Sequence, residues 1–211
     1  EKNDIAGHLR SKNYNSINLG VSGSGPLVSL AILREYLAEF KPSYVVYLYF
    51  EGNDLNDLNW EKKTYLINYL DEHFKIEYLK KRNQIVEFLD DYQNEINNNI
   101  KNLNLEIFTD IKKNKFFETL KDILEISNLK GIYRSTFSNE ENKIDIDLFY
   151  EVIKAINHEV SRNGSNLIFV YLPTWSRYYT KFNKEKFLYD KKEPILKFVR
   201  KNNIDVIDFE N

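Results

Sequence analysis

The sequence predicts an α/β fold with an open, mostly parallel sheet. Three apolar runs of strand length carry this prediction, at Tyr44–Phe50, 166–173 and 204–209. Segments between them repeat apolar residues near the helical period of 3.6. Nearly continuous apolar strands are typical of parallel sheets with helices on both faces. We therefore expect each of these strands to be buried on both faces.

The remaining elements are expected in a regular order within one domain over residues 1–211. A short strand is predicted at 16–19, followed by a Gly/Ser loop and a helix over 27–40. Residues 60–130 are helical in pattern and highly charged, and they are too many for a simple crossover, so we predict a helical insertion there. A helix over 144–163 and a partly helical stretch at 184–203 complete the pattern.

Composition disfavours several classes of partner. The chain has 30 basic and 32 acidic residues, a net charge of -2, so nothing in its overall charge attracts nucleic acid or an anionic membrane. No apolar run approaches the roughly 20 residues of a membrane span. Zero cysteines exclude disulfides and cysteine-based zinc sites, and no His, Asp and Glu cluster has metal-ligand spacing. We expect neither a metal nor a cofactor.

Polar loops follow the predicted strands at 20–26, 51–57 and 173–179. Ligands of open α/β sheets usually bind beyond the carboxyl ends of strands, so these loops are the expected site. Asn53 offers a neutral amide that can donate to an oxyanion, and Gly23 offers a backbone N–H with no Cβ in the way. The structural alternative is a tight turn at Asn53 with helix capping after it.

A family resemblance rests on two of these loops. "NLGVSGSGP" at 18–26 and "EGND" at 51–54 resemble blocks two and three of the SGNH (GDSL-type) hydrolases, which are flavodoxin-like esterases and acyltransferases with a Ser-His-Asp triad. The resemblance implies that Gly23 and Asn53 complete an oxyanion hole with the N–H of the nucleophilic serine. Glu51 stands where the family pattern has a glycine, while Asn53 and Asp54 match it.

The family's other two blocks have no counterpart in this sequence. A Gly-Asp-Ser motif should precede Asn18 and an Asp-x-x-His stretch should follow the last strand, and neither is present. The chain also lacks methionine, so we expect a fragment that is inactive as printed. His8, His73 and His158 fit ordinary surface or boundary positions better than a catalytic base.

Further residues are expected to line the substrate. Ser22 and Ser24 are predicted loop formers beside the ligand, Asp54 lies next to Asn53, and Trp175 lies in the aromatic loop at 173–179. That loop equally suits a cover over the core. Arg177 within it is expected to be exposed and able to bind a carboxylate or phosphate.

The resemblance thus implies an SGNH-type serine esterase or O-acyltransferase acting on a small-molecule or glycan ester, for instance an acetylated carbohydrate. Two alternatives from other classes stay open. One is a non-catalytic α/β module that binds a glycan or small ligand at the same strand ends. The other is an interaction domain that docks a partner through the helical insertion at 60–130.

Overall fold

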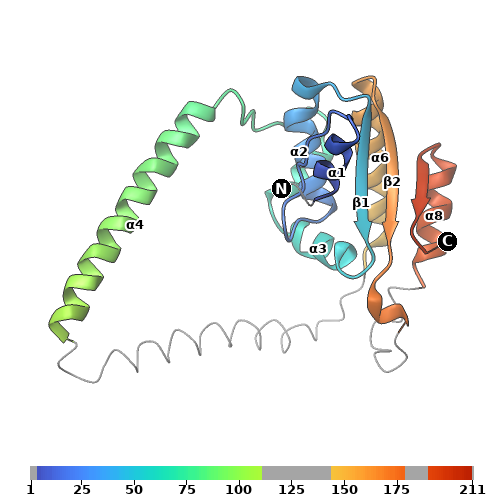
Figure 1. Ribbon diagram of the computed structural model, residues 1–211. Coiled ribbons are helices and arrows are strands. Elements are labelled where there is room, and N and C mark those ends of the chain that lie inside the picture. The colour runs from blue at the N-terminus through green and yellow to red at the C-terminus, as the bar shows by residue number, and fades with distance from the viewer. Residues whose placement is uncertain (1–3, 111–143, 179–189, 211) are drawn as a thin grey trace. The chain divides into compact units, whose positions relative to one another are not determined.

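The sheet is the centre of the fold. The computed structural model describes residues 4–110, 144–178 and 190–210 (Figure 1). The sheet holds β1 (Tyr44–Phe50), β2 (Asn166–Leu172) and β3 (Asp205–Asp208), in that spatial order. Both ladders are parallel, with Tyr47 opposite Phe169 and Phe169 opposite Val206. The predicted α/β class with an open parallel sheet is confirmed.

Helices precede, connect and follow the strands. They are α1 (Ile5–Ser11), α2 (Pro26–Phe40), α3 (Asp54–Glu61), α4 (Arg82–Asp110), α6 (Ile146–Arg162) and α8 (Lys192–Lys201), with 3-10 helices η1 (Tyr65–Leu70) and η3 (Trp175–Tyr178). The helices predicted at 27–40 and 144–163 are confirmed. At the start of α6 the Asp145 side chain accepts the Leu148 N–H, and Gly164 follows its end with φ +74°, as capping rules anticipate.

The chain divides into two compact units. One comprises Glu1–Ile76 with Ile144–Asn211 and contains the sheet, and the other is Glu77–Lys143 and contains α4. The predicted insertion at 60–130 is helical over most of its described part, and residues 111–130 lie outside the described residues. Because the second unit begins at Glu77, α3 and η1 belong with the sheet rather than with the insertion.

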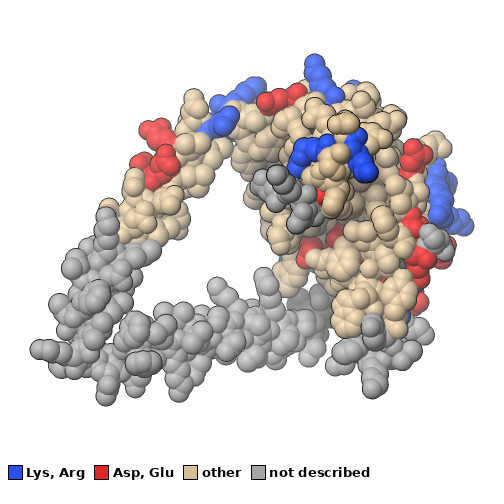
Figure 2. All heavy atoms as spheres, viewed as in Figure 1, with Lys and Arg blue, Asp and Glu red and all other residues tan. Residues whose placement is uncertain are grey.

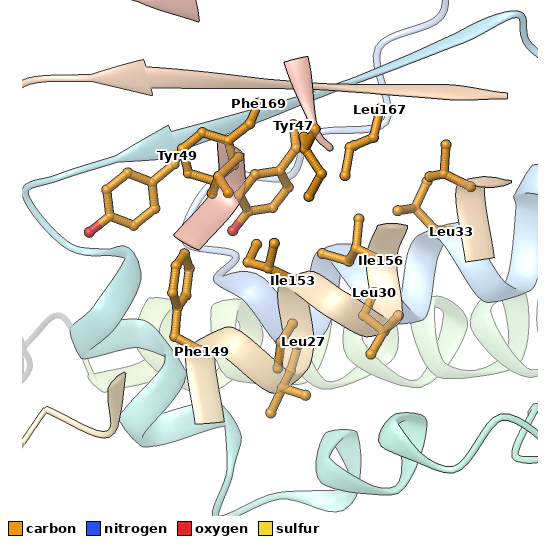
Figure 3. Close-up of a cluster of buried hydrophobic side chains, with 14 of the residues drawn as sticks. Leu27, Leu30, Leu33, Tyr47, Tyr49, Phe149, Ile153, Ile156, Leu167 and Phe169 are labelled. Atoms are coloured by element: carbon orange, nitrogen blue, oxygen red, sulfur yellow. The ribbon is translucent and has the colours of Figure 1, made fainter. Parts of the chain in front are cut away.

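One face of the sheet, here called the inner face, packs against helices. Tyr47 and Tyr49 of β1 point with Phe169 of β2 toward α2 and α6, where they meet side chains such as Leu30 and Ile153 (Figure 3). The ring centroids of Tyr49 and Phe169 are 5.6 Å apart. Helix α8 adjoins the same layer, since its Phe198 ring stacks 4.0 Å from Tyr150 of α6. Three helices therefore cover the inner face.

The opposite face, here called the outer face, is largely apolar. It is open to solvent along β1 and β3, whereas Val170 of β2 on the same face is 4% exposed. Val46 and Leu48 of β1 are 48% and 42% exposed, and Ile207 of β3 is 48% exposed. The prediction that these two strands are buried on both faces is wrong. Helices α2, α6 and α8 all pack on the inner face, so the expected helices on both faces are found here on one.

The strand predicted at 16–19 is also wrong. The structure has no strand there, and Ile17 and Leu19 are exposed. A strand needs a neighbour for its ladder, and residues 16–19 pair with no strand of the described chain. Apolar alternation alone therefore did not make this segment a strand.

Two surface properties bear on the expected partners. Acidic and basic side chains occur side by side on the face that Figure 2 shows, without one broad basic patch. No described helix combines the length and hydropathy needed to cross a membrane.

Candidate functional site at the strand ends

The Gly/Ser loop is attached to helix α3 through a buried carboxylate. The Gly25 N–H donates to Glu61 Oε1 at 2.6 Å, and the Leu27 N–H donates to Glu61 Oε2 at 2.8 Å. This carboxylate therefore satisfies free N–H groups at the amino end of α2. A Cβ at Gly25 would lie 2.8 Å from Glu61 Oε2 and from the Asp57 Cβ, so only glycine fits at this close approach.

Asn53 lies directly after β1, at the start of α3, and its side chain is exposed. Its Nδ2 donates to Asp57 Oδ2 at 2.7 Å. Asp57 is also the residue that approaches Gly25 from α3. The two predicted motif loops are thus neighbours, joined by Asp57. Because an amide nitrogen carries two N–H groups, Asn53 keeps one for a ligand.

Gly23 forms the tip of the loop. A turn runs from Val21 to Ser24, in which the Ser24 N–H and Oγ both donate to the Val21 carbonyl, at 3.2 and 2.6 Å. Gly23 has φ +75°, a conformation that favours glycine, and open space surrounds it. Ser22 is exposed beside it, whereas the Ser24 hydroxyl is engaged within the turn. The loop therefore presents backbone at its tip.

Asp54, the other acidic candidate, points into the protein. It is 7% exposed and accepts the Phe50 N–H at 3.2 Å, which closes the turn from β1 into α3. Burial raises the pKa of Asp54 to about 8, and the nearby charges of Asp57 and Glu61 add to that rise. Asp54 therefore holds the turn between β1 and α3, and its burial leaves little of its surface for a substrate.

Glu51 organises the neighbouring loop, a role that sequence reasoning missed. It is 1% exposed and accepts the Thr174 N–H and Arg177 Nε, both at 3.1 Å. Arg177 Nη2 and the Tyr171 hydroxyl also donate to it. Burial alone would raise the pKa of Glu51, but the bonds from Arg177 and Tyr171 outweigh burial and lower it. Arg177, expected to be exposed, is thus mostly buried on a carboxylate of its own chain.

This ion pair extends to the third strand. Arg177 Nη1 lies 3.5 Å from Glu210 Oε1, and Lys192 Nζ lies 2.8 Å from Asp208 Oδ2 and 2.5 Å from Glu210 Oε2. The Lys192 ammonium also lies 5.2 Å from the centre of the Tyr171 ring. Charged pairs therefore link the carboxyl ends of all three strands. A glutamate buried at position 51, where the family pattern has glycine, needs a positively charged partner. That need is the sequence signal that could have pointed to Arg177.

Trp175 begins η3, the 3-10 helix that also carries Arg177. Trp175 and Tyr178 are 61% and 58% exposed. Side chains three residues apart eclipse on a 3-10 helix, so both rings share one side of η3. Tyr179, the last residue of the predicted aromatic loop, lies outside the described residues.

The rest of the described chain adds no further chemistry to this edge. Within the described ranges, no group of three or more His, Cys, Asp and Glu side chains is placed to hold a metal ion. His8, His73 and His158 are exposed and lie in separate parts of the chain. Comparison with protein-family models, with curated proteins and with solved structures finds no match for this chain.

Proposed function

We propose that this chain carries the oxyanion-stabilising part of an SGNH-type serine esterase or O-acyltransferase. One observation supports the proposal most. The loop with Gly23 and the turn with Asn53 are distant in sequence but are joined by Asp57 and Glu61 at the carboxyl end of β1. Two donors at one such edge suit a reaction in which a carbonyl oxygen becomes negatively charged.

The proposed chemistry is attack on an ester carbonyl by a serine hydroxyl, with a histidine as general base oriented by an aspartate. Those three groups lie, under this proposal, outside residues 1–211. Gly23 N–H and Asn53 Nδ2 donate to the tetrahedral oxyanion. Asp57 acts as a positioning residue, because its bond to Nδ2 fixes the plane of the Asn53 amide.

The substrate proposed is a small-molecule or glycan ester. Trp175 and Tyr178 support this choice, because two exposed rings on one side of η3 offer flat apolar faces with polar edges. Glu51 and Arg177 hold that loop from beneath. In the assay below, Trp175→Ala is expected to raise KM and leave kcat unchanged.

Asn53→Ala in the whole protein tests the proposal. In an acetyl-ester assay, kcat is expected to fall about 10²- to 10³-fold, which is the usual effect of losing one oxyanion donor. Asn56→Ala is the matched control, because it removes the same type of side chain one turn further along α3 and is expected to leave kcat unchanged.

An unchanged kcat in Asn53→Ala contradicts the role of Asn53. Absence of ester turnover in the unaltered whole protein contradicts the enzyme itself. In that second case a ligand-binding module at the same strand ends accounts better for the exposed rings and the open loop.

A further inference from the structure

Helix α4 carries a row of large apolar side chains that are open to solvent. The members that are at least 40% exposed are Val86, Phe88, Leu89, Tyr92 and Ile96. Intervals of four, three and four residues separate Ile85, Leu89, Tyr92 and Ile96. This alternation is typical of the two core positions of a coiled coil. The apolar row, as we call residues 85–96 of α4, therefore fits a second helix.

The charges of α4 are poorly placed for a helix on its own. Its amino end carries the basic residues Lys81 and Arg82, where the helix dipole favours acidic ones. An acidic group follows at Glu87, Asp90, Asp91 and Glu95, and Figure 2 shows the basic and acidic groups one after the other along α4. Like charges three or four residues apart destabilise a helix. Arg82 and Glu87, the nearest opposite charges of the two groups, are five residues apart and lack the spacing at which they would pair.

A second copy of α4 in antiparallel orientation provides what each helix lacks. With Phe88 of the two copies side by side, Lys81 of each copy lies beside Glu95 of the other, because both are seven residues from Phe88. The same register places Ile85 beside Leu89 of the second copy, so the apolar row is covered by its own counterpart. Every contact occurs twice, as a twofold interface requires. The sequence of α4 is therefore complementary to itself in both charge and hydropathy.

The order of the charges favours the antiparallel orientation over the parallel one. Arg82 is seven residues before Leu89 and so occupies the same position of the coiled-coil repeat. A parallel pair in register would place Arg82 of both copies in one layer and the two acidic groups side by side. In the antiparallel pair, Arg82 instead meets the Tyr92 ring of the second copy, and an aromatic face attracts a cation.

We propose that residues 81–96 bind the same residues of a second copy of this chain, as an antiparallel pair of α4 helices. The helical insertion then makes the chain a twofold dimer. The exposed apolar row supplies the contact area, and the basic and acidic groups set the direction and the register. This inference rests on α4 alone and does not depend on the proposed ester chemistry.

Exchange of one pair of charges tests the inference. Sedimentation velocity over a series of protein concentrations measures the dissociation constant of the dimer of residues 1–211. Lys81→Glu and Glu95→Lys are each expected to raise this constant at least about tenfold, because each places like charges together at two points of the interface. The double variant restores opposite charges and is expected to recover most of the affinity. Positions 81 and 95 are about 21 Å apart along one helix, so the recovery requires two copies.

A matched control and a cross-linking experiment complete the test. Lys197→Glu makes the same change of charge at an exposed position of α8 and is expected to leave the dissociation constant unchanged. Because the chain has no cysteine, introduced thiols report the orientation of the helices. A mixture of Lys81→Cys and Glu95→Cys is expected to form a covalent dimer with a short bismaleimide. Either variant by itself is expected to form little.

Three results overturn the inference. The first is a monomer of residues 1–211 at tens of micromolar protein, because a different segment or a different protein would then cover the apolar row. The second is a dimer whose affinity is unchanged in Lys81→Glu or is not recovered in the double variant. The third is efficient cross-linking of Lys81→Cys with itself, which indicates a parallel pair. Ester turnover enters none of these measurements, so their outcome is independent of the proposed function.

Discussion

The inner and outer faces of the sheet carry similar side chains in opposite surroundings. On the inner face Tyr49, Phe169 and Tyr171 are at most 1% exposed, whereas on the outer face Val46 and Leu48 are nearly half exposed. Both sets alternate along the same strands. The apolar character of a strand therefore shows that its faces need cover, but it does not show whether this chain provides the cover.

The comparison also applies to charge. Glu51 continues the inner side of β1 and is tolerated there through Arg177 and Tyr171. Asp205 stands at an exposed position of β3 and needs no such partner. On the buried inner face an unpaired charged side chain lowers the stability of the fold. On the exposed outer face it costs little, because water solvates it.

The two faces should differ most in how much stability is lost when one of their side chains is truncated. Phe169→Ala is expected to lower the free energy of unfolding by about 3–5 kcal/mol, because it leaves a cavity among Tyr47 and Tyr49. Leu48→Ala on the outer face is expected to cost less than about 1 kcal/mol. Urea denaturation of both variants of residues 1–211 measures the difference. Equal losses would mean that the outer face is covered in this chain.

Removal of one buried charge should have the next largest effect. Glu51→Gln is expected to lower the free energy of unfolding by about 3 kcal/mol, because the mostly buried Arg177 then lacks a negatively charged partner. Glu39→Gln on the exposed end of α2 is the control and is expected to change stability little. In the double variant with Arg177→Leu, part of the loss should be recovered. A loss in Glu51→Gln no larger than in the control contradicts the role of the ion pair.

The pH dependence of stability should distinguish the buried Asp54 from an exposed aspartate. The pKa of Asp54 is about 8 in the folded chain, against an ordinary value of 3.8. The folded state therefore holds a proton that the unfolded state has released between these two values. This stabilising contribution is complete below about pH 4 and declines as pH rises toward 8, by at most about 1.4 kcal/mol per pH unit.

Asp54→Asn should flatten that decline, since the amide oxygen can still accept the Phe50 N–H. Asp205→Asn on β3 serves as the control and is expected to leave the dependence in place. Denaturation midpoints between pH 5 and 8 measure both variants. If the decline in stability persists in Asp54→Asn, another titrating group causes it.

Much of the fold followed from local patterns. Tyr44–Phe50 was predicted with its observed bounds, and β2 and β3 differ from their predicted runs only at the ends. These strands are short, apolar and bounded by turn residues, so local sequence is sufficient to identify them. The segment at 16–19 has a similar pattern and is not a strand. Its outcome depends on a neighbour, which local sequence does not contain.

The candidate site divides in the same way. The motif loops supplied Gly23 and Asn53 as candidates, and residue types alone suggested oxyanion donors. The link through Asp57 was not predicted, because it depends on how α3 packs against the start of α2. Arg177 was considered a carboxylate ligand, but its carboxylate, Glu51, lies 126 positions away in the sequence.

The sequence by itself determined the α/β class, the strand positions and the residue types available at the strand ends, because these depend on periodicity and local chemistry. The tertiary structure decided which face of the sheet is covered, which carboxylate each cation meets and that Asn53 and the Gly/Ser loop are neighbours. Those properties depend on contacts between segments far apart in the chain. Their energies come from burial, which exists only after the elements have packed.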